Sequence, residues 1–185
     1  MFKIIPNWHP VFVHFTLGLL MIATALYLVT LLLPDNSRHR NDLLLVANWN
    51  LWIGYAFALV TAWFGWCAFN SVTHDSASHA AMIEHRNWAL TTLLVYLPVV
   101  AWSMIRAKSA RPVNWLFMIV LLVPAALLAS TGWHGAELVY RHGLGVMSLP
   151  QSEGHDHLQG DHADNHDHEA THDHATEHHH DATME

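Results

Sequence analysis

Residues 10–33, PVFVHFTLGLLMIATALYLVTLLL, decide the fold class of this chain. The stretch contains no Asp, Glu, Lys or Arg and is longer than the roughly 20 apolar residues that a helix needs to cross a bilayer. Three further stretches have the same character, at about 43–69, 88–105 and 115–131. None of the four has the charged face that is typical of a helix in a soluble protein. The sequence therefore predicts an all-α protein, a four-helix transmembrane bundle.

Charge divides the chain into two parts. Hydrophobic residues make up 52% of the chain and charged residues only 12%. All eight Lys and Arg lie within residues 1–150, which have a net charge of +3, whereas residues 151–185 have a net charge of −10. We predict a four-span membrane domain over 1–148 and a disordered His/Asp-rich tail over 149–185, because the tail lacks the apolar side chains to form a core. Without a basic patch, and with a tail that would repel phosphate, we expect no nucleic-acid partner.

The tryptophans form two groups near the predicted ends of the spans. Such aromatic belts are typical of side chains that meet the lipid headgroups, so a lipid bilayer is the expected surrounding. Those near one membrane surface are Trp8, Trp63, Trp66, Trp88 and Trp133, and those near the other are Trp49, Trp52, Trp102 and Trp115.

Basic residues indicate the direction of the spans. Five lie in the connectors after the first and third spans, namely Arg38, Arg40, Arg106, Lys108 and Arg111. Three lie on the opposite side, namely Lys3, Arg86 and Arg141. Because basic connectors stay in the cytoplasm, this bias predicts a multi-pass protein of the bacterial inner membrane with both termini periplasmic or extracellular.

Seven of the eight histidines in the membrane domain then lie toward the side of the termini. They are His9 and His14 in the first span, His74, His79 and His85 in the connector leading into the third, and His134 and His142 near the end of the fourth. Pro10 suits the first turn of a helix, which places His14 roughly 6 Å inside the helix. Gly18, Met21 and Ala25 share its face, and small residues there let another helix approach. We therefore predict that His14 points into the bundle.

An ionisable side chain inside a membrane bundle is expected to have a function, because an unpartnered one is costly there. We predict that His14, His85 and His142, together with His9, hold haem b or copper near the outer surface, since imidazole ligates both. The walls of a haem slot would come from Phe12, Phe15, Trp63, Phe64 and Trp66, and Cys67 could join a copper or zinc site. The plainer interpretation is that each histidine is an interfacial hydrogen-bonding residue.

Three segments resemble the bacterial membrane family known as domain-of-unknown-function family 2231. They are WHPVFVHFTLGLL at 8–20, the His85-Arg86 pair, and TGWHGAELVYRHGLGV at 131–146. Residues at matching places are His9, His14, Glu137, Tyr140, His142, Gly143 and Gly145. Thr16 stands where the family commonly has proline, and Ala136 replaces the second glycine of a Gly-Gly pair. The resemblance covers residues 8–146 and implies respiratory redox work only by association, because some relatives are joined to iron–sulfur or cytochrome domains.

The tail contains ten histidines among acidic residues. They are His155, His157, His162, His166, His168, His172, His174, His178, His179 and His180. Histidine-rich tracts bind Zn, Ni, Co or Cu through changing sets of imidazoles, so we predict metal binding here. An acidic solubilising segment or an expression tag is the alternative, although a tag is disfavoured because only three histidines are consecutive.

These features predict a membrane redox or metal-handling protein, with respiratory or metal-handling proteins as partners and a homodimer as one possible state. The alternatives are a transition-metal transporter or accessory protein, and a non-catalytic membrane scaffold. Glu137 with His134 or His142 could form an acid/base pair, but without a nucleophile or phosphate-loop motif we do not expect an enzyme.

Overall fold

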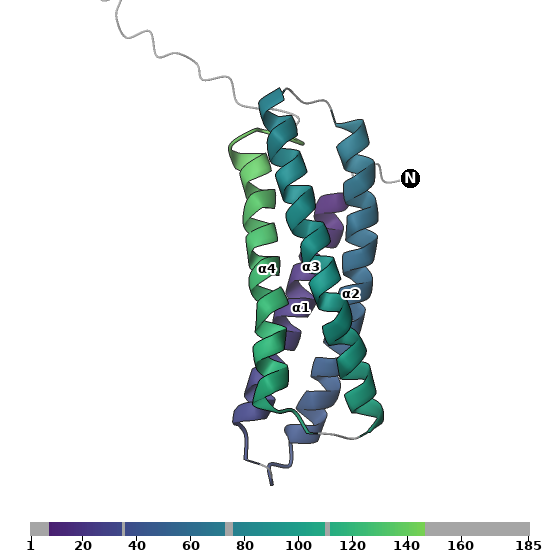
Figure 1. The fold of residues 1–185 in the computed structure, drawn as a ribbon, viewed down its shortest axis with the longest axis vertical. Helices are drawn as coiled ribbons and strands as arrows, with labels where there is room; N and C mark the ends of the chain where they lie inside the picture. Colours follow the sequence, from purple (N-terminus) through teal and green to yellow (C-terminus); the bar gives the residue numbers. More distant parts are fainter. Residues whose placement is uncertain (1–7, 35, 73–75, 110–111, 147–185) are drawn as a thin grey trace, which may run out of the picture. The chain divides into compact units, whose positions relative to one another are not determined.

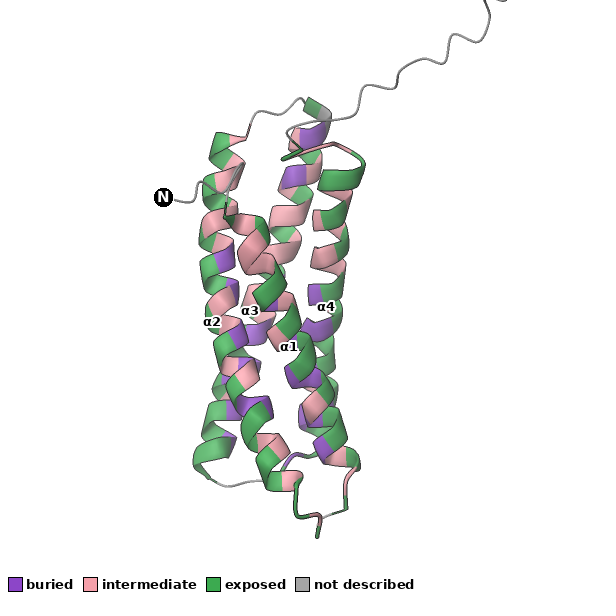
Figure 2. Cartoon of the chain, turned by 180° about the vertical axis from the view of Figure 1, so that it is seen from behind, coloured by how far each residue is buried: buried purple, intermediate pink, exposed green. Residues whose placement is uncertain are grey.

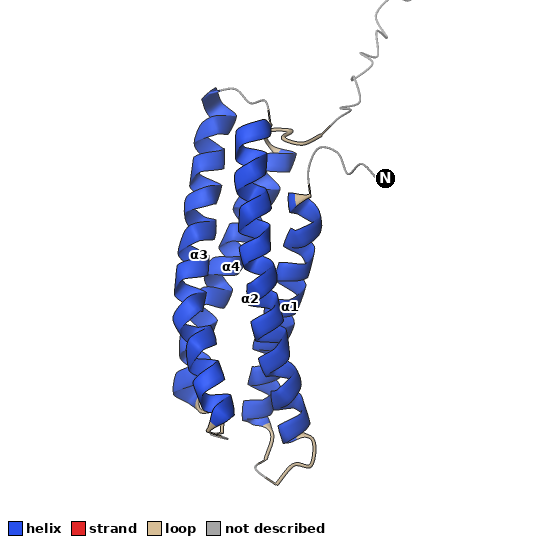
Figure 3. Ribbon diagram, turned by 90° about the vertical axis from the view of Figure 1, so that its right-hand side faces the viewer, coloured by secondary structure: helices blue, strands red, loops and turns tan. Residues whose placement is uncertain are grey.

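The computed structural model describes residues 8–34, 36–72, 76–109 and 112–146, and these residues form four long helices and no strand (Figures 1 and 3). The helices are α1 (His9–Leu32), α2 (Arg40–Ser71), α3 (Ser76–Lys108) and α4 (Trp115–Tyr140). All four are long and apolar enough to span a membrane, which confirms the predicted four-helix fold and makes this a multi-pass membrane protein. The predicted tail at 149–185 lies outside the described residues.

The helices are longer than the apolar stretches that predicted them. α3 begins at Ser76, well before the predicted start at residue 88, and α4 continues to Tyr140. Backbone hydrogen bonding within a helix does not end where the apolar sequence ends, so polar turns extend each span beyond the bilayer core. His79 and His85 therefore lie on α3, and the prediction that placed them in a connector is wrong.

Each helix packs against two neighbours. α1 contacts α2 and α4, and α3 contacts the same two helices, so α1 and α3 lie on one diagonal of the bundle (Figure 1). We call the end of the bundle with His9, His85 and His134 the histidine end; it is the upper end in Figure 1. The opposite end, with Arg40 and Arg106, is called the arginine end.

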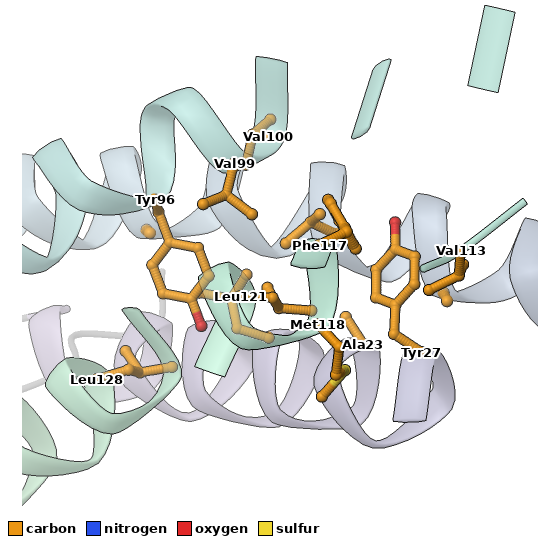
Figure 4. Close-up of a cluster of buried hydrophobic side chains, with 14 residues drawn as sticks. Ala23, Tyr27, Tyr96, Val99, Val100, Val113, Phe117, Met118, Leu121 and Leu128 are labelled. Carbon is orange, nitrogen blue, oxygen red and sulfur yellow. The ribbon is translucent and has the colours of Figure 1, made fainter. Parts of the chain in front are cut away.

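The core fills the middle of the bundle. Buried segments occur on all four helices, separated by exposed ones (Figure 2). Tyr27 packs edge-on against Phe117, with ring centroids 5.0 Å apart, and Tyr96 lies further toward the histidine end (Figure 4). The outward face is apolar as well: Leu94 is 69% exposed and Ile105 is 64% exposed. An apolar exterior of this kind suits contact with lipid chains.

Most tryptophans of both predicted belts are exposed, including Trp49 and Trp115 at the arginine end. At the histidine end, Trp63, Trp66 and Trp133 are exposed, as lipid-facing belt residues should be. At the arginine end, Trp52 and Trp102 pack partly against the core. Trp52 donates a hydrogen bond from Nε1 to the Ser103 hydroxyl at 2.7 Å. Those two residues therefore stabilise helix packing rather than mark the membrane surface.

The two helical hairpins, α1–α2 and α3–α4, repeat one burial pattern. Six positions of α1 are buried, and adding 76 to each number gives a buried position of α3: Thr16, Leu20, Ala23, Thr24, Tyr27 and Thr30 correspond to Thr92, Tyr96, Val99, Val100, Ser103 and Arg106. Adding 70 to Ala47, Asn48, Leu51, Gly54 and Ala58 of α2 gives Phe117, Met118, Leu121, Pro124 and Leu128 of α4, which are also buried. The two hairpins therefore bury equivalent positions.

Candidate functional site

A cavity of about 370 Å³ opens between the two hairpins near the histidine end. Residues from all four helices line it, and most of its wall is aliphatic. Several of these residues are small, namely Ala58, Ala62, Ala89, Gly132 and Ala136. The polar groups at the cavity include two histidines from diagonal helices, His9 of α1 and His85 of α3.

His9 and His85 meet across the bundle. Their ring centroids are 6.3 Å apart, and the ring planes are nearly perpendicular, at 79°. The two residues are equivalent positions of the two hairpins, because 9 and 85 also differ by 76. At this ring pair, one residue from each hairpin comes into contact.

Each histidine sits in a matching setting in its own hairpin. The Nδ1 atom of His9 is 3.0 Å from the backbone carbonyl oxygen of Thr61. His85 lies against the carbonyl of Thr131, the equivalent residue of α4, although its buried Nδ1 has no partner of standard hydrogen-bond geometry among the described residues. The His9 ring is thus anchored to the backbone of its hairpin. The His85 ring lies at the equivalent carbonyl of the other hairpin, and its Nδ1 atom has no hydrogen-bond partner among the described residues.

Two glycines make room for the rings. A Cβ atom at Gly65 would stand 3.0 Å from Cε1 of His9, and one at Gly135 would stand 3.1 Å from Cε1 of His85. Both distances are shorter than ordinary carbon–carbon contacts. Gly65 and Gly135 are equivalent positions, 70 residues apart, so each hairpin uses a glycine to admit its histidine.

Paired threonines lie beneath the histidines. The hydroxyls of Thr16 and Thr61 are 2.8 Å apart, and those of Thr92 and Thr131 are also 2.8 Å apart. Each pair joins the two helices of one hairpin. One member of each pair, Thr61 or Thr131, is also the residue whose backbone carbonyl lies at the histidine. Tyr96 lies deeper in the same cavity, where its buried hydroxyl has no partner of good geometry among the described residues.

His14 does not point into the bundle, contrary to the prediction from Gly18, Met21 and Ala25. His14 is exposed, and its Nδ1 lies 2.5 Å from the carbonyl of Pro10 in its own helix, although its ring still contributes to the lining of the cavity. Gly18, Met21 and Ala25 are exposed as well, because α1 buries the stripe through Thr16, Leu20 and Tyr27 instead. The stripe that was predicted to face the core faces outward.

The predicted three-histidine set is not assembled. Within the described part of the chain, no three His, Cys, Asp or Glu side chains are close enough to share a metal ion. His142 lies after the end of α4 and is not among the residues that line the cavity. Cys67 is exposed. His74 and the ten histidines of the tail lie outside the described residues.

The aromatic residues predicted as walls lie elsewhere. Phe12 stacks on Phe64 with ring centroids 4.9 Å apart, and Phe15 stacks on Phe57 at 5.3 Å. These pairs hold α1 to α2, whereas Trp63 and Trp66 face outward. Aliphatic and small side chains form the wall of the cavity in their place.

Glu137 is engaged at the surface rather than in the cavity. One carboxylate oxygen accepts a hydrogen bond from Nη1 of Arg141 at 2.5 Å. The other oxygen is 3.7 Å from Nδ1 of His134, whose ring stacks on Trp88. This cluster caps the histidine end, and an ion pair with an exposed arginine does not suit a carboxylate for acid/base chemistry.

A short repeat could have identified the site from the sequence. Residues 61–65 read TAWFG and residues 131–135 read TGWHG, so both contain Thr-x-Trp-x-Gly. In the first helix of each hairpin, a histidine precedes a threonine by seven residues: His9 precedes Thr16 in α1, and His85 precedes Thr92 in α3. This spacing indicates that His9 and His85 occupy equivalent positions in the two hairpins. Composition and depth along the helix do not indicate this.

One family profile, described as "Predicted membrane protein (DUF2231)", matches residues 6–148. No curated protein and no solved structure matches the chain. The matched segment includes all four helices and the histidine pair His9 and His85. Because the match covers well over half of the chain, the protein belongs to this family of predicted membrane proteins.

Proposed function

We propose that this protein is a membrane haem protein in which His9 and His85 are the axial ligands of one haem b, and that it transfers electrons at the membrane. The distance between the two imidazole rings carries the proposal. Imidazole nitrogens bind a transition metal at about 2 Å, and a ring centre lies about 1 Å behind its nitrogen, so two rings on opposite sides of one metal have centroids about 6 Å apart. The observed separation is 6.3 Å.

The number of ligands favours haem over a bare ion. Zinc takes three or four protein ligands, and copper(II) sites also use several. The described residues offer two imidazoles at this point and no three-ligand group. Haem iron needs only two axial ligands from the protein, because the macrocycle supplies the other four.

The orientation of the histidines also suits ligation. Histidines that bind metals usually donate their other ring N–H to a carbonyl or carboxylate, which fixes the tautomer and the ring direction. Nδ1 of His9 meets the carbonyl of Thr61, and His85 lies at the equivalent carbonyl of Thr131. Ligation by His9 would therefore use Nε2.

The cavity suits a flat apolar group. Its wall consists of Ala and Gly at several places on both sides, together with Leu17, Leu20 and Leu93. Small residues keep the hairpins from filling the space with their own side chains, and a largely apolar wall excludes water. Haem supplies one-electron redox chemistry when it is bound, and these residues would bind it, orient it and shield it from water.

The predicted topology would place this haem near the periplasmic surface. Electron exchange with a respiratory or metal-handling partner on that side is part of the proposal, and metal binding by the histidine-rich tail remains a separate prediction. A transport pathway has less support, because Leu20, Leu51, Phe117 and Leu121 are fully buried and fill the bundle between its two ends.

Absorbance of purified variants tests the proposal. The full chain is produced with haem precursor, purified in detergent, and measured for a Soret band and for haem content per chain. We expect one haem per chain in the wild type, and loss of most of it in His9→Ala and in His85→Ala, because each variant loses one axial ligand.

His142→Ala is the matched control and should keep the haem, since His142 lies after the end of α4 and is not among the residues that line the cavity. All variants carry the same tail, so any haem or metal held there cancels in the comparison. A wild type that contains no haem, or a His9→Ala variant that keeps its full haem content, would show that the proposal is wrong. Metal analysis of the same samples distinguishes a bare copper site.

A further inference from the structure

A second cavity, of about 430 Å³, lies at the arginine end of the bundle. It is lined by residues of all four helices, including Tyr27, Asn48, Trp52 and Arg106. The fully buried core separates this cavity from the one at the histidine end. The haem proposal makes no use of it.

Arg106 is the central charge of this cavity. Its side chain is only 8% exposed, and its guanidinium group lies 4.3 Å from the centroid of the Phe117 ring. Nη2 donates a hydrogen bond to the carbonyl of Pro112. No Asp or Glu of the described residues forms an ion pair with Arg106. A buried cation is expected to have a counter-charge, because burial without one is unfavourable.

Several hydrogen-bonding groups around Arg106 are already paired with one another or with the backbone. The Tyr27 hydroxyl donates a hydrogen bond to Oδ1 of Asn48 at 2.5 Å. The side-chain NH2 of Asn48 is therefore the group that remains to donate to a ligand. Ser103 accepts from Trp52 and donates to the carbonyl of Val100 at 2.7 Å. Arg40, a second cation, lines the same cavity. The cavity thus presents the guanidinium of Arg106 and the amide NH2 of Asn48, and no Asp or Glu is among its described lining residues.

We propose that this cavity is a binding site for a phosphate-type oxyanion, held by the guanidinium of Arg106 and the amide NH2 of Asn48. A planar guanidinium binds phosphate oxygens through parallel hydrogen bonds, and an amide N–H adds a neutral donor.

Two sources could supply this oxyanion. The arginine end is the end that the basic residues place in the cytoplasm, where anionic phospholipid headgroups meet basic pockets between membrane helices. Free phosphate in the cytoplasm has the same chemistry. Binding of either by Arg106 and Asn48 is the proposal, and the experiment separates the two.

Thermal unfolding of the full chain in neutral detergent measures the binding. Phosphatidylglycerol in mixed micelles is titrated in one arm and inorganic phosphate in the other, and a ligand of the native state raises the unfolding temperature. Asn48→Asp is the main variant, because it adds a carboxylate to the wall of the cavity that Arg106 also lines, and this negative charge should repel an oxyanion. Arg106→Gln removes the cation, and Arg38→Gln, an exposed arginine at the same end, is the matched control.

We expect at least one of the two ligands to stabilise the wild type and Arg38→Gln, with affinity at least about tenfold weaker in Asn48→Asp. Stabilisation by phosphatidylglycerol alone identifies a lipid headgroup as the source, and stabilisation by inorganic phosphate identifies the free anion. If neither ligand stabilises the wild type, or if Asn48→Asp responds as strongly as the wild type, the proposal is overturned. The test of the proposal does not require Arg106→Gln to fold. Asn48→Asp keeps the buried arginine and is sufficient by itself.

Discussion

Gly65 and Gly135 set how closely His9 and His85 approach the second helix of each hairpin. A methyl group at either glycine would meet the histidine ring at 3.0 or 3.1 Å. We predict that Gly65→Ala and Gly135→Ala each weaken haem binding by about tenfold or more, because groups that orient a ligating histidine usually contribute that much. Overpacking should also lower the free energy of unfolding by about 1–3 kcal/mol. Haem titration and thermal unfolding measure the two effects.

Gly18→Ala is the control for this pair of variants. A Cβ atom at Gly18 would meet nothing within 4 Å, and the residue lies on the exposed side of α1. Its haem affinity should equal that of the wild type. Equal affinity in Gly65→Ala and Gly18→Ala would mean that the position of the His9 ring is irrelevant to haem binding.

At single residues, the sequence identified histidines that line the cavity but did not give the direction of each side chain. His9 and His85 were both among the candidate ligands, and both line the cavity. The depth of His14 and the positions of Gly18, Met21 and Ala25 predict that it points into the bundle, whereas its side chain is exposed. Depth along a helix follows from residue numbers, but the rotation of that helix about its axis does not.

Single elements show why this rotation was hard to predict. α1 is apolar on every side, since Thr16 and Leu20 face the core while Ile22 and Leu32 face outward. A soluble helix reveals its buried face through polar residues on the other, but a helix in lipid has no such contrast. The repeated burial pattern of α1 and α3 supplies the missing information, because both halves must bury equivalent positions.

α4 begins at a capped residue. The Asn114 side chain accepts a hydrogen bond from the backbone N–H of Phe117 at 3.0 Å, which satisfies one donor of the first turn. We predict that Asn114→Ala lowers the free energy of unfolding by about 1 kcal/mol, the usual contribution of such a cap. Thermal or denaturant unfolding in detergent, with haem content recorded in parallel, checks this.

Asn50→Ala is a suitable comparison for the capping variant. Asn50 lies inside α2, and its side-chain NH2 donates a hydrogen bond to the carbonyl of Val46 in its own helix at 2.8 Å. Its replacement should change stability by less than that of Asn114 and should leave haem content unchanged. A larger loss in Asn50→Ala than in Asn114→Ala would contradict the assignment of Asn114 as the residue that begins α4.

Across the whole molecule, the four spans and their order followed from the apolar stretches alone. The pairing of His9 with His85 did not, because it depends on the diagonal arrangement of α1 and α3. The arrangement of helices in a bundle depends on side-chain packing between segments far apart in sequence. The Thr-x-Trp-x-Gly repeat connects the two halves and was the signal that reasoning from single spans overlooked.

The two cavities give the bundle different chemistry at its two ends. Imidazoles and an apolar wall lie at the histidine end, and donors with a buried guanidinium lie at the arginine end. The equivalent halves explain the first site, since each hairpin contributes one histidine, one glycine and one threonine pair. They do not make the second site symmetrical, because Thr30 stands in α1 where Arg106 stands in α3.

Electron paramagnetic resonance of the oxidised, haem-loaded full chain tests the central claim, that His9 and His85 bind one iron from opposite sides. We predict a low-spin ferric signal from one six-coordinate haem per chain, converted to a high-spin signal or lost altogether in His9→Ala and in His85→Ala alike. A high-spin signal in the wild type, or a low-spin signal that persists in either variant, would contradict it.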